Sequence, residues 1–320
     1  MFRSILPVAL AFTFLSGCTT KSGYSREELS QYEQEINAWH THRLQQVKAQ
    51  DGWLNLLGLY WLETGINTFG SGANNQVVFP DSTLEEQAGY FLVEHDHVEM
   101  QLNQDTRAMI KRKPVRNETI FYADSIKQPQ VENDRIAWTI IRRDGKFGVR
   151  VRDLTMQAVK NFRGVERFPI DPEYRVEATF VPAEGRTIDI TNVLGQTTSQ
   201  NSPGTLVFTW KGAEQTLDVL EGGKEEYFVI IADETSGKET YAGGRYLYVK
   251  HADERGKVVL DFNKTYNPPC VFTPYATCPL PPHQNILPFR VLAGEKVYNH
   301  DLSPTAERAT ASLKCLALVL

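Results

Sequence analysis

The C-terminal third of the 320-residue chain holds the side chains best suited to chemistry. Hydrogen-bonding residues are dense there: Asp233, Thr235, Thr240, Tyr241, Arg245, Asp261, Asn263, Tyr266 and Asn267. Strand alternation places Arg245 and Leu247 on one face. A lone buried guanidinium is costly, so we predict that Arg245 pairs with Asp261 on the next strand. The cluster is then either a pocket whose arginine binds a carboxylate or phosphate, or a buried network that fixes strand register.

A proline-rich loop follows this cluster. Six prolines lie between Pro268 and Pro282, and they fix φ and remove backbone donors, so the loop cannot be a central strand. Cys270 and Cys278 lie within it, eight residues apart. We predict a disulfide between them, because a turn-rich loop brings such residues together. The alternatives are two free buried thiols, or a nucleophile or metal pair with His283.

The same region is similar to a bacterial family called domain of unknown function 1684. The resemblance rests on Arg245-Tyr246-Leu247, Asp261-Phe262-Asn263, Tyr266-Asn267-Pro268-Pro269-Cys270, Cys278-Pro279-Leu280-Pro281-Pro282 and Ala293-Gly294-Glu295-Lys296. A weaker similarity runs back through 150–153 to Trp53. The resemblance supplies no activity.

The N-terminus resembles a bacterial lipoprotein leader. An apolar run of 5–15 precedes Leu15-Ser16-Gly17-Cys18 and is too short to span a bilayer. The resemblance implies cleavage before Cys18 and lipidation of that residue, with acyl chains such as palmitate. We therefore expect a signal peptide at 1–17, a tether at 18–24 and a lipid-anchored protein of the bacterial cell envelope. Thr19 favours the periplasmic face of the outer membrane in a Gram-negative host.

Charge and motifs exclude several classes of function. The chain has 34 basic and 39 acidic residues, so nothing in its net charge favours nucleic acid as a partner. It has no G-x-G-x-x-G, P-loop, H-E-x-x-H or G-x-S-x-G motif, which argues against dehydrogenases, kinases and zincins. We predict no cofactor and no metal site.

The remaining pattern predicts a mainly β protein with one N-terminal helix. Ser25 and Glu28 form a capping box for a helix at 25–50. Its predicted buried stripe consists of Leu29, Tyr32, Ile36, Trp39 and Val47. His40 and His42 point to different sides of this helix, and we predict both at the surface. Short apolar strands separated by Gly, Pro and Asp turns then indicate an antiparallel sandwich or barrel. The strands form either two β modules or one large sandwich or barrel.

The predicted modules have unequal sizes. Residues 51–125 form a small β module, whose segments 65–71 and 75–80 resemble the start of a forkhead-associated sandwich, without its phosphothreonine-binding pattern. Residues 126–300 form the main β domain. Residues 301–320 form a tail outside the fold, with docking on the β domain as the alternative.

These observations predict a lipid-anchored envelope protein whose β domain binds a small ligand or an envelope protein. One alternative is a hydrolase or other enzyme that uses the polar cluster between Asp233 and Asn267. A second alternative is a structural component of the envelope.

Overall fold

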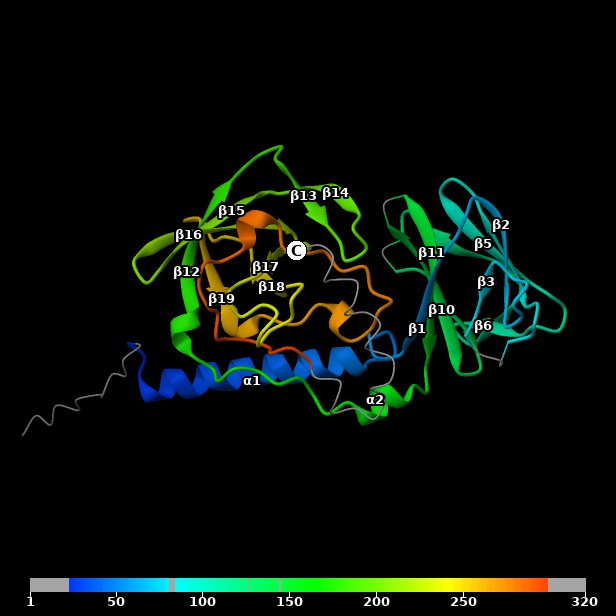
Figure 1. The fold of residues 1–320 in the computed structure, drawn as a ribbon, viewed down its shortest axis with the longest axis horizontal. Helices are drawn as coiled ribbons and strands as arrows, with labels where there is room; N and C mark the ends of the chain where they lie inside the picture. The colour runs from blue at the N-terminus through cyan, green and yellow to red at the C-terminus, as the bar shows by residue number, and fades with distance from the viewer. Residues whose placement is uncertain (1–22, 81–83, 126, 144, 299–320) are drawn as a thin grey trace, which may run out of the picture.

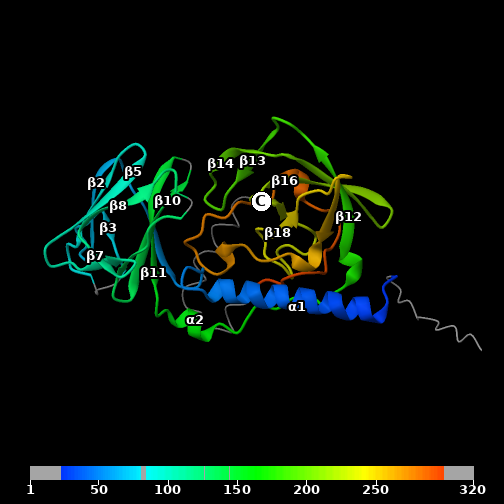
Figure 2. The same ribbon diagram turned by 180° about the vertical axis from the view of Figure 1, so that it is seen from behind.

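A computed structural model describes residues 23–80, 84–125, 127–143 and 145–298. The protein is mainly β and antiparallel, with one long helix near its N-terminus. This confirms the predicted fold class. Figures 1 and 2 show two β modules side by side, with the helix running beneath the larger one.

The smaller module packs two sheets face to face. Its core contains Trp138, which is fully buried, and the stacked rings of Phe69 and Phe91, whose centroids lie 4.3 Å apart. One sheet has the order β1-β11-β10-β9-β6-β7 and the other β3-β2-β4-β5-β8. The strands are β1 (Leu56–Trp61), β2 (Gly65–Gly70), β3 (Val77–Val78), β4 (Gly89–Val93), β5 (His97–Leu102), β6 (Ala108–Ile110), β7 (Lys113–Val115), β8 (Asn117–Tyr122), β9 (Val131–Asn133), β10 (Ile136–Arg143) and β11 (Lys146–Asp153).

The first module extends further along the chain than its predicted end at 125. Strands β9, β10 and β11 belong to the sandwich, because β11 pairs with β1 and β9 pairs with β6. Val131, Ile136 and Val151 are buried in the same core as Phe69. Periodicity marked these strands, but it carries no information about which core they join.

The larger module is a nearly closed barrel. Its sheet has the order β18-β17-β16-β15-β12-β19, so β18 and β19 are the two edges. Leu206, Leu217, Val229 and Leu260 fill the interior. The strands are β12 (Arg175–Pro182), β15 (Gly204–Trp210), β16 (Ala213–Glu221), β17 (Glu226–Ile231), β18 (Arg245–Lys250) and β19 (Lys257–Asp261), with β13 (Thr187–Thr191) and β14 (Thr197–Asn201) as a separate hairpin.

Helix α1 (Arg26–Lys48) lies along the base of the barrel (Figure 1). The predicted capping box is present: the Glu28 N–H donates to the Ser25 hydroxyl at 3.2 Å, and the Ser25 N–H donates to the Glu28 carboxylate at 2.7 Å. The helix buries Tyr32, Ile36 and Val47. The shorter helical segments are α2 (Gln157–Asn161), η1 (Pro172–Tyr174), η2 (Phe262–Lys264), η3 (Pro269–Val271) and η4 (His283–Asn285).

Several predicted features fall outside the described residues: the signal peptide, the Cys18 lipidation site, residues 18–22 of the tether and the 301–320 tail. Within the described part of the chain, no helix combines the length and apolar character needed to cross a bilayer.

The close packing around Gly294 leaves no room for a side chain. Its φ is +76°, and a Cβ added there would lie 2.5 Å from the Thr265 carbonyl oxygen. We expect Gly294→Ala to lower the free energy of unfolding by about 2–5 kcal/mol, because left-handed strain and overpacking add. Gly212 is the matched control, with φ +84° and nothing within 4 Å of an added Cβ. Gly212→Ala is expected to cost about 1–2 kcal/mol in urea unfolding; equal losses would contradict the packing argument.

Candidate functional site

Arg245 is at the centre of the predicted polar cluster, and it is fully buried at the start of β18. Its Nη2 donates to the Asp233 carboxylate at 2.8 Å and to the Val291 carbonyl at 2.9 Å. Its Nη1 donates to the carbonyl of Ala293. The guanidinium therefore joins the turn after β17 to the C-terminal segment 291–295. The predicted partner Asp261 was wrong, because Asp233 occupies the paired position.

The Asp233 carboxylate organises the rest of this cluster. Its Oδ1 accepts hydrogen bonds from the Thr235 N–H at 2.9 Å, the Thr235 hydroxyl at 2.7 Å and the Val291 N–H at 3.1 Å. The hydroxyls of Thr235 and Thr240 lie 2.9 Å apart. All four side chains are at most 5% exposed. The bonds are internal, so this part of the cluster is packed solid and presents no open surface to a substrate.

Asp261 and Asn263 form a second group that holds α1. The Tyr32 hydroxyl donates to Asp261 Oδ1 at 2.9 Å, and Asn263 Nδ2 donates to the Tyr32 oxygen at 2.9 Å. Asn263 also exchanges bonds with the Asp171 backbone, at 2.8 and 3.0 Å. Burial raises the pKa of Asp261, although the Tyr32 bond opposes this. This group is a structural connection between the helix and the barrel.

A third group contains Asn267 and the fully buried Glu295. The Asn267 N–H donates to Glu295 Oε2 at 2.8 Å, while Oε1 lies 3.7 Å from His40 Nε2 and 3.9 Å from Arg43 Nε. Burial raises the pKa of Glu295. It lowers the pKa of His40 to about 4, assisted by the positive charges of Arg167 and Arg43. The predicted surface position of His40 was wrong: it faces the barrel, whereas His42 is exposed.

The two loop cysteines are adjacent but free. The Cys270 N–H donates to Cys278 Sγ at 3.0 Å. Burial raises the pKa of the Cys278 thiol. Tyr241 lies against this pair, and burial raises its pKa. The predicted disulfide is therefore corrected to two free thiols, and His283 is exposed in η4.

Tyr266 belongs to an open site, which we name the α1 cleft. Two hollows of about 640 and 630 Å³ adjoin along α1, and both are lined by Trp39, Glu226, Tyr248 and Tyr266. The cleft follows the seam where β18 and β19 are not paired. The Tyr248 and Tyr266 rings are stacked, with centroids 6.4 Å apart and planes inclined by 13°. Tyr248 is 42% exposed, so its ring is available to a ligand.

Sequence reasoning missed two residues of this cleft. Trp39 was assigned to the buried stripe of the helix, but it is only half-buried. Arg43 is buried, and its guanidinium lies 4.6 Å from the centroid of the Tyr266 ring and donates to the Asn267 carbonyl at 3.0 Å. The sequence did contain a signal. Trp39 and Arg43 are four residues apart and share one helix face, and a purely apolar stripe would not include the cation.

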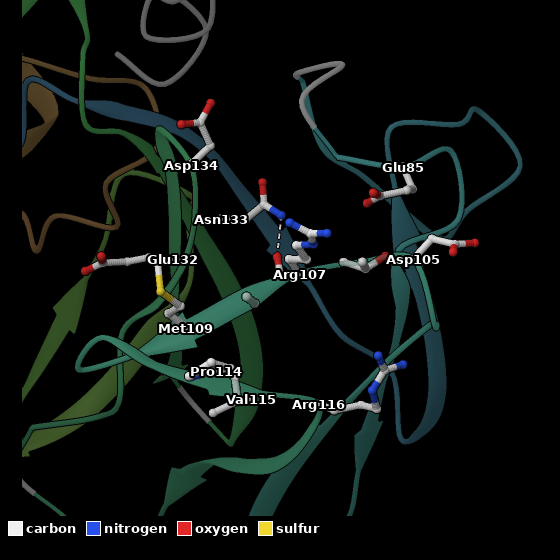
Figure 3. A pocket seen from close by; sticks show the side chains of 12 residues that line it. Glu85, Asp105, Arg107, Met109, Pro114, Val115, Arg116, Glu132, Asn133 and Asp134 are labelled. Atoms are coloured by element: carbon white, nitrogen blue, oxygen red, sulfur yellow. Dashed lines mark hydrogen bonds between the residues drawn. The ribbon is translucent and has the colours of Figure 1, made fainter.

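A larger hollow of about 830 Å³ lies in the smaller module, beside β6 and β9. Figure 3 shows its charged side chains, including Glu132, Asp134 and Arg116, pointing away from one another. Arg107 has its carbonyl bonded by Asn133. Because the polar groups do not converge, we do not assign a site here.

The comparisons with known proteins concern this C-terminal region above all. The family model described as "Protein of unknown function (DUF1684)" matches residues 160–296. An uncharacterized protein of Haloarcula marismortui, with a solved structure, is 32% identical over 43% of this chain and 78% of its own, at a TM-score of 0.36. The chain belongs to the DUF1684 family.

The other similarities to this DUF1684 protein are weak. Two forkhead-associated domain structures, one of them of FhaA, are 16% identical, cover 29% of this chain and 92% and 97% of their own, and have TM-scores of 0.19. We draw nothing from them. No curated protein matches. The matched range 160–296 contains Arg245, Asp261, Asn267 and Glu295, so it spans both the packed network and one wall of the α1 cleft.

The buried Arg245–Asp233 pair generates a stability prediction. We expect Arg245→Met to lower the free energy of unfolding by about 3–5 kcal/mol, because it leaves the Asp233 carboxylate buried without its cation. Arg255→Met is the matched control, since Arg255 and Asp253 form an exposed pair at 3.4 Å, and it is expected to cost less than about 1 kcal/mol. Urea unfolding measures both. Similar losses of stability in the two variants would show that the buried pair stabilises the fold no more than an exposed pair does.

Proposed function

We propose that this protein is a lipid-anchored component of the bacterial cell envelope that binds a small ligand in the α1 cleft. The observation that carries the binding proposal is the row of aromatic rings along the unpaired seam of the barrel. Tyr248 is exposed there beside Tyr266 and the half-buried Trp39. Tyrosine and tryptophan combine a flat apolar face with a polar edge, which suits them to ligand contacts.

The charges of the cleft favour a neutral ligand. Lys264 pairs with Glu35 at 2.6 Å, and Lys257 pairs with Glu177 at 2.9 Å. These internal pairs leave little net field to attract an ion. Glu226 is exposed on the same wall and forms no ion pair among the described residues. Its oxygens can therefore accept hydrogen bonds from hydroxyl groups.

A saccharide has the required chemistry. The C–H face of a pyranose ring packs flat on an aromatic ring, and its hydroxyls bond to carboxylates at the edges. The two adjoining hollows, of about 640 and 630 Å³, offer room for more than one ring. We therefore infer that the ligand is a short neutral oligosaccharide.

The alternative of a hydrolase at the polar cluster has less support. Asp233, Thr235, Thr240 and Asn267 are buried and bonded to one another or to the backbone. A catalytic group must reach its substrate, and these side chains face the protein interior. A purely structural role for the cluster fits the same bonds, and it is compatible with a binding cleft elsewhere on the barrel.

Tyr248 provides the test of ligand binding. We expect the full chain to bind the N-acetylglucosamine tetramer in isothermal titration calorimetry, and Tyr248→Ala to weaken this binding about tenfold, because a stacking surface worth roughly 1 kcal/mol or more is lost. Tyr122→Ala is the matched control: Tyr122 is 46% exposed on β8 in the other module. An unchanged affinity in Tyr248→Ala would contradict the assignment of the cleft, and binding of tetra-alanine in place of the saccharide would contradict the ligand class.

The lipid anchor has an independent test. We expect the wild-type chain to partition into the detergent phase of a Triton X-114 extract, and Cys18→Ala to remain in the aqueous phase with its leader uncleaved, because the thiol that carries the lipid is absent. An unchanged partition of Cys18→Ala would show that Cys18 does not anchor the protein.

A further inference from the structure

Strand β11 carries two buried arginines on the face turned away from the core of the smaller module. Val149 and Val151 point into that core, and both are fully buried. Arg150 and Arg152 alternate with them, so both side chains lie on the opposite face. They are only 7% and 6% exposed. Figure 1 places this strand in the part of the smaller module nearest the barrel.

Neither arginine has a carboxylate partner at salt-bridge distance in the described part of the chain. Arg150 lies with its guanidinium carbon 5.2 Å from the centroid of the Trp53 ring, and its buried Nε has no hydrogen-bond partner. Arg152 Nη2 donates to the Asp51 backbone carbonyl at a long 3.3 Å, and its Nε is also buried without a partner. The buried Oδ1 of Asn55, close by in sequence, is likewise without one.

The charges that act on this pair make the arrangement unfavourable by itself. Arg150 is subject to the positive charges of Arg152 and Arg143, and Arg152 is subject to the more distant carboxylate of Asp51. Burial, followed by these like charges, lowers the pKa of Arg150 to about 10. Both guanidinium groups remain charged at neutral pH. Two adjacent buried cations without counterions are costly, and proteins normally satisfy such groups.

An oxyanion would satisfy them. A guanidinium presents parallel N–H donors in a planar fork, which matches the oxygens of a carboxylate or phosphate group. The Trp53 ring packs on Arg150 and limits its movement, so the fork is already oriented. Trp53 and Asp51 also line the end of the α1 cleft, which gives the arginines a neighbouring route to solvent.

We propose that Arg150 and Arg152 form a binding site for a small oxyanion, a phosphate or carboxylate group, at the junction of the two β modules. This site uses β11 of the sandwich and stands independently of the saccharide proposal. The bound anion would neutralise the two cations and supply acceptors for their unpartnered N–H groups. Binding would therefore stabilise the fold as well as select the ligand.

The test measures thermal unfolding of the full chain with inorganic phosphate or sodium acetate, each against sodium chloride at equal ionic strength. We expect a melting temperature that rises by several degrees and saturates at millimolar anion, because a ligand that binds only the folded state stabilises it by mass action. Arg150→Met and Arg152→Met should abolish this rise. Arg116→Met is the matched control, since Arg116 is exposed and, among the described residues, its side chain donates to the backbone carbonyls of residues 103 and 104.

Comparing the two anions shows whether the site binds a phosphate or a carboxylate group. A saturating response to phosphate alone assigns a phosphate site, and a response to acetate alone assigns a carboxylate site; either supports the proposal. A rise that does not saturate, or that is equal in Arg150→Met and Arg116→Met, overturns it. If Arg150→Met does not fold, Arg150→Lys keeps the charge and removes the fork, and calorimetry should then show at least a tenfold weaker affinity for the responding anion. An unchanged affinity in Arg150→Lys also overturns the proposal.

Discussion

The barrel depends on one fully buried guanidinium. Arg245 is bonded to Asp233 and to the carbonyl groups of Val291 and Ala293, so it links the turn after β17 to the last described segment of the chain. That segment brings Glu295 against Asn267. The desolvated charge is tolerable only while all its partners are in place. The position of Glu295 against Asn267, beside α1, is thus tied to the bonds of a single buried cation.

Incomplete closure of the barrel explains where the candidate ligand site lies. Strands β18 and β19 are the edges of the sheet and do not pair with each other. An uncovered strand edge can pair with another chain and so promotes aggregation. Helix α1 crosses this seam and is held to it by Tyr32 and Arg43. The helix covers the edge without sealing it, so the aromatic rings of Tyr248 and Tyr266 remain in an open cleft.

The sequence was sufficient for the elements and insufficient for their partners. The capping box at Ser25 predicted the start of α1, and strand alternation placed Arg245 on the same face as Leu247. The predicted partner was Asp261, on the next strand along the chain, whereas the path of the turn after β17 brings Asp233 to the guanidinium. The module boundary was misplaced for the same reason: β9, β10 and β11 have ordinary strand patterns, which do not show that β11 pairs with β1 and β9 with β6. Trp39 was assigned to the core because a helical stripe does not show where the covering sheet ends.

The contact between Tyr32 and Asp261 has a consequence for biosynthesis. The two residues are 229 positions apart in the chain. At a translation rate of about 5–20 residues per second, roughly 10–50 s separate the synthesis of the helix from that of its docking partner. Throughout that interval Ile36 and Val47 of α1 lack the barrel that covers them, so their apolar side chains can cause aggregation. Contacts of such long range also slow folding. Helix α1 therefore cannot reach its native position before Asp261 has been synthesised, and until then its apolar face is a target for a holding chaperone.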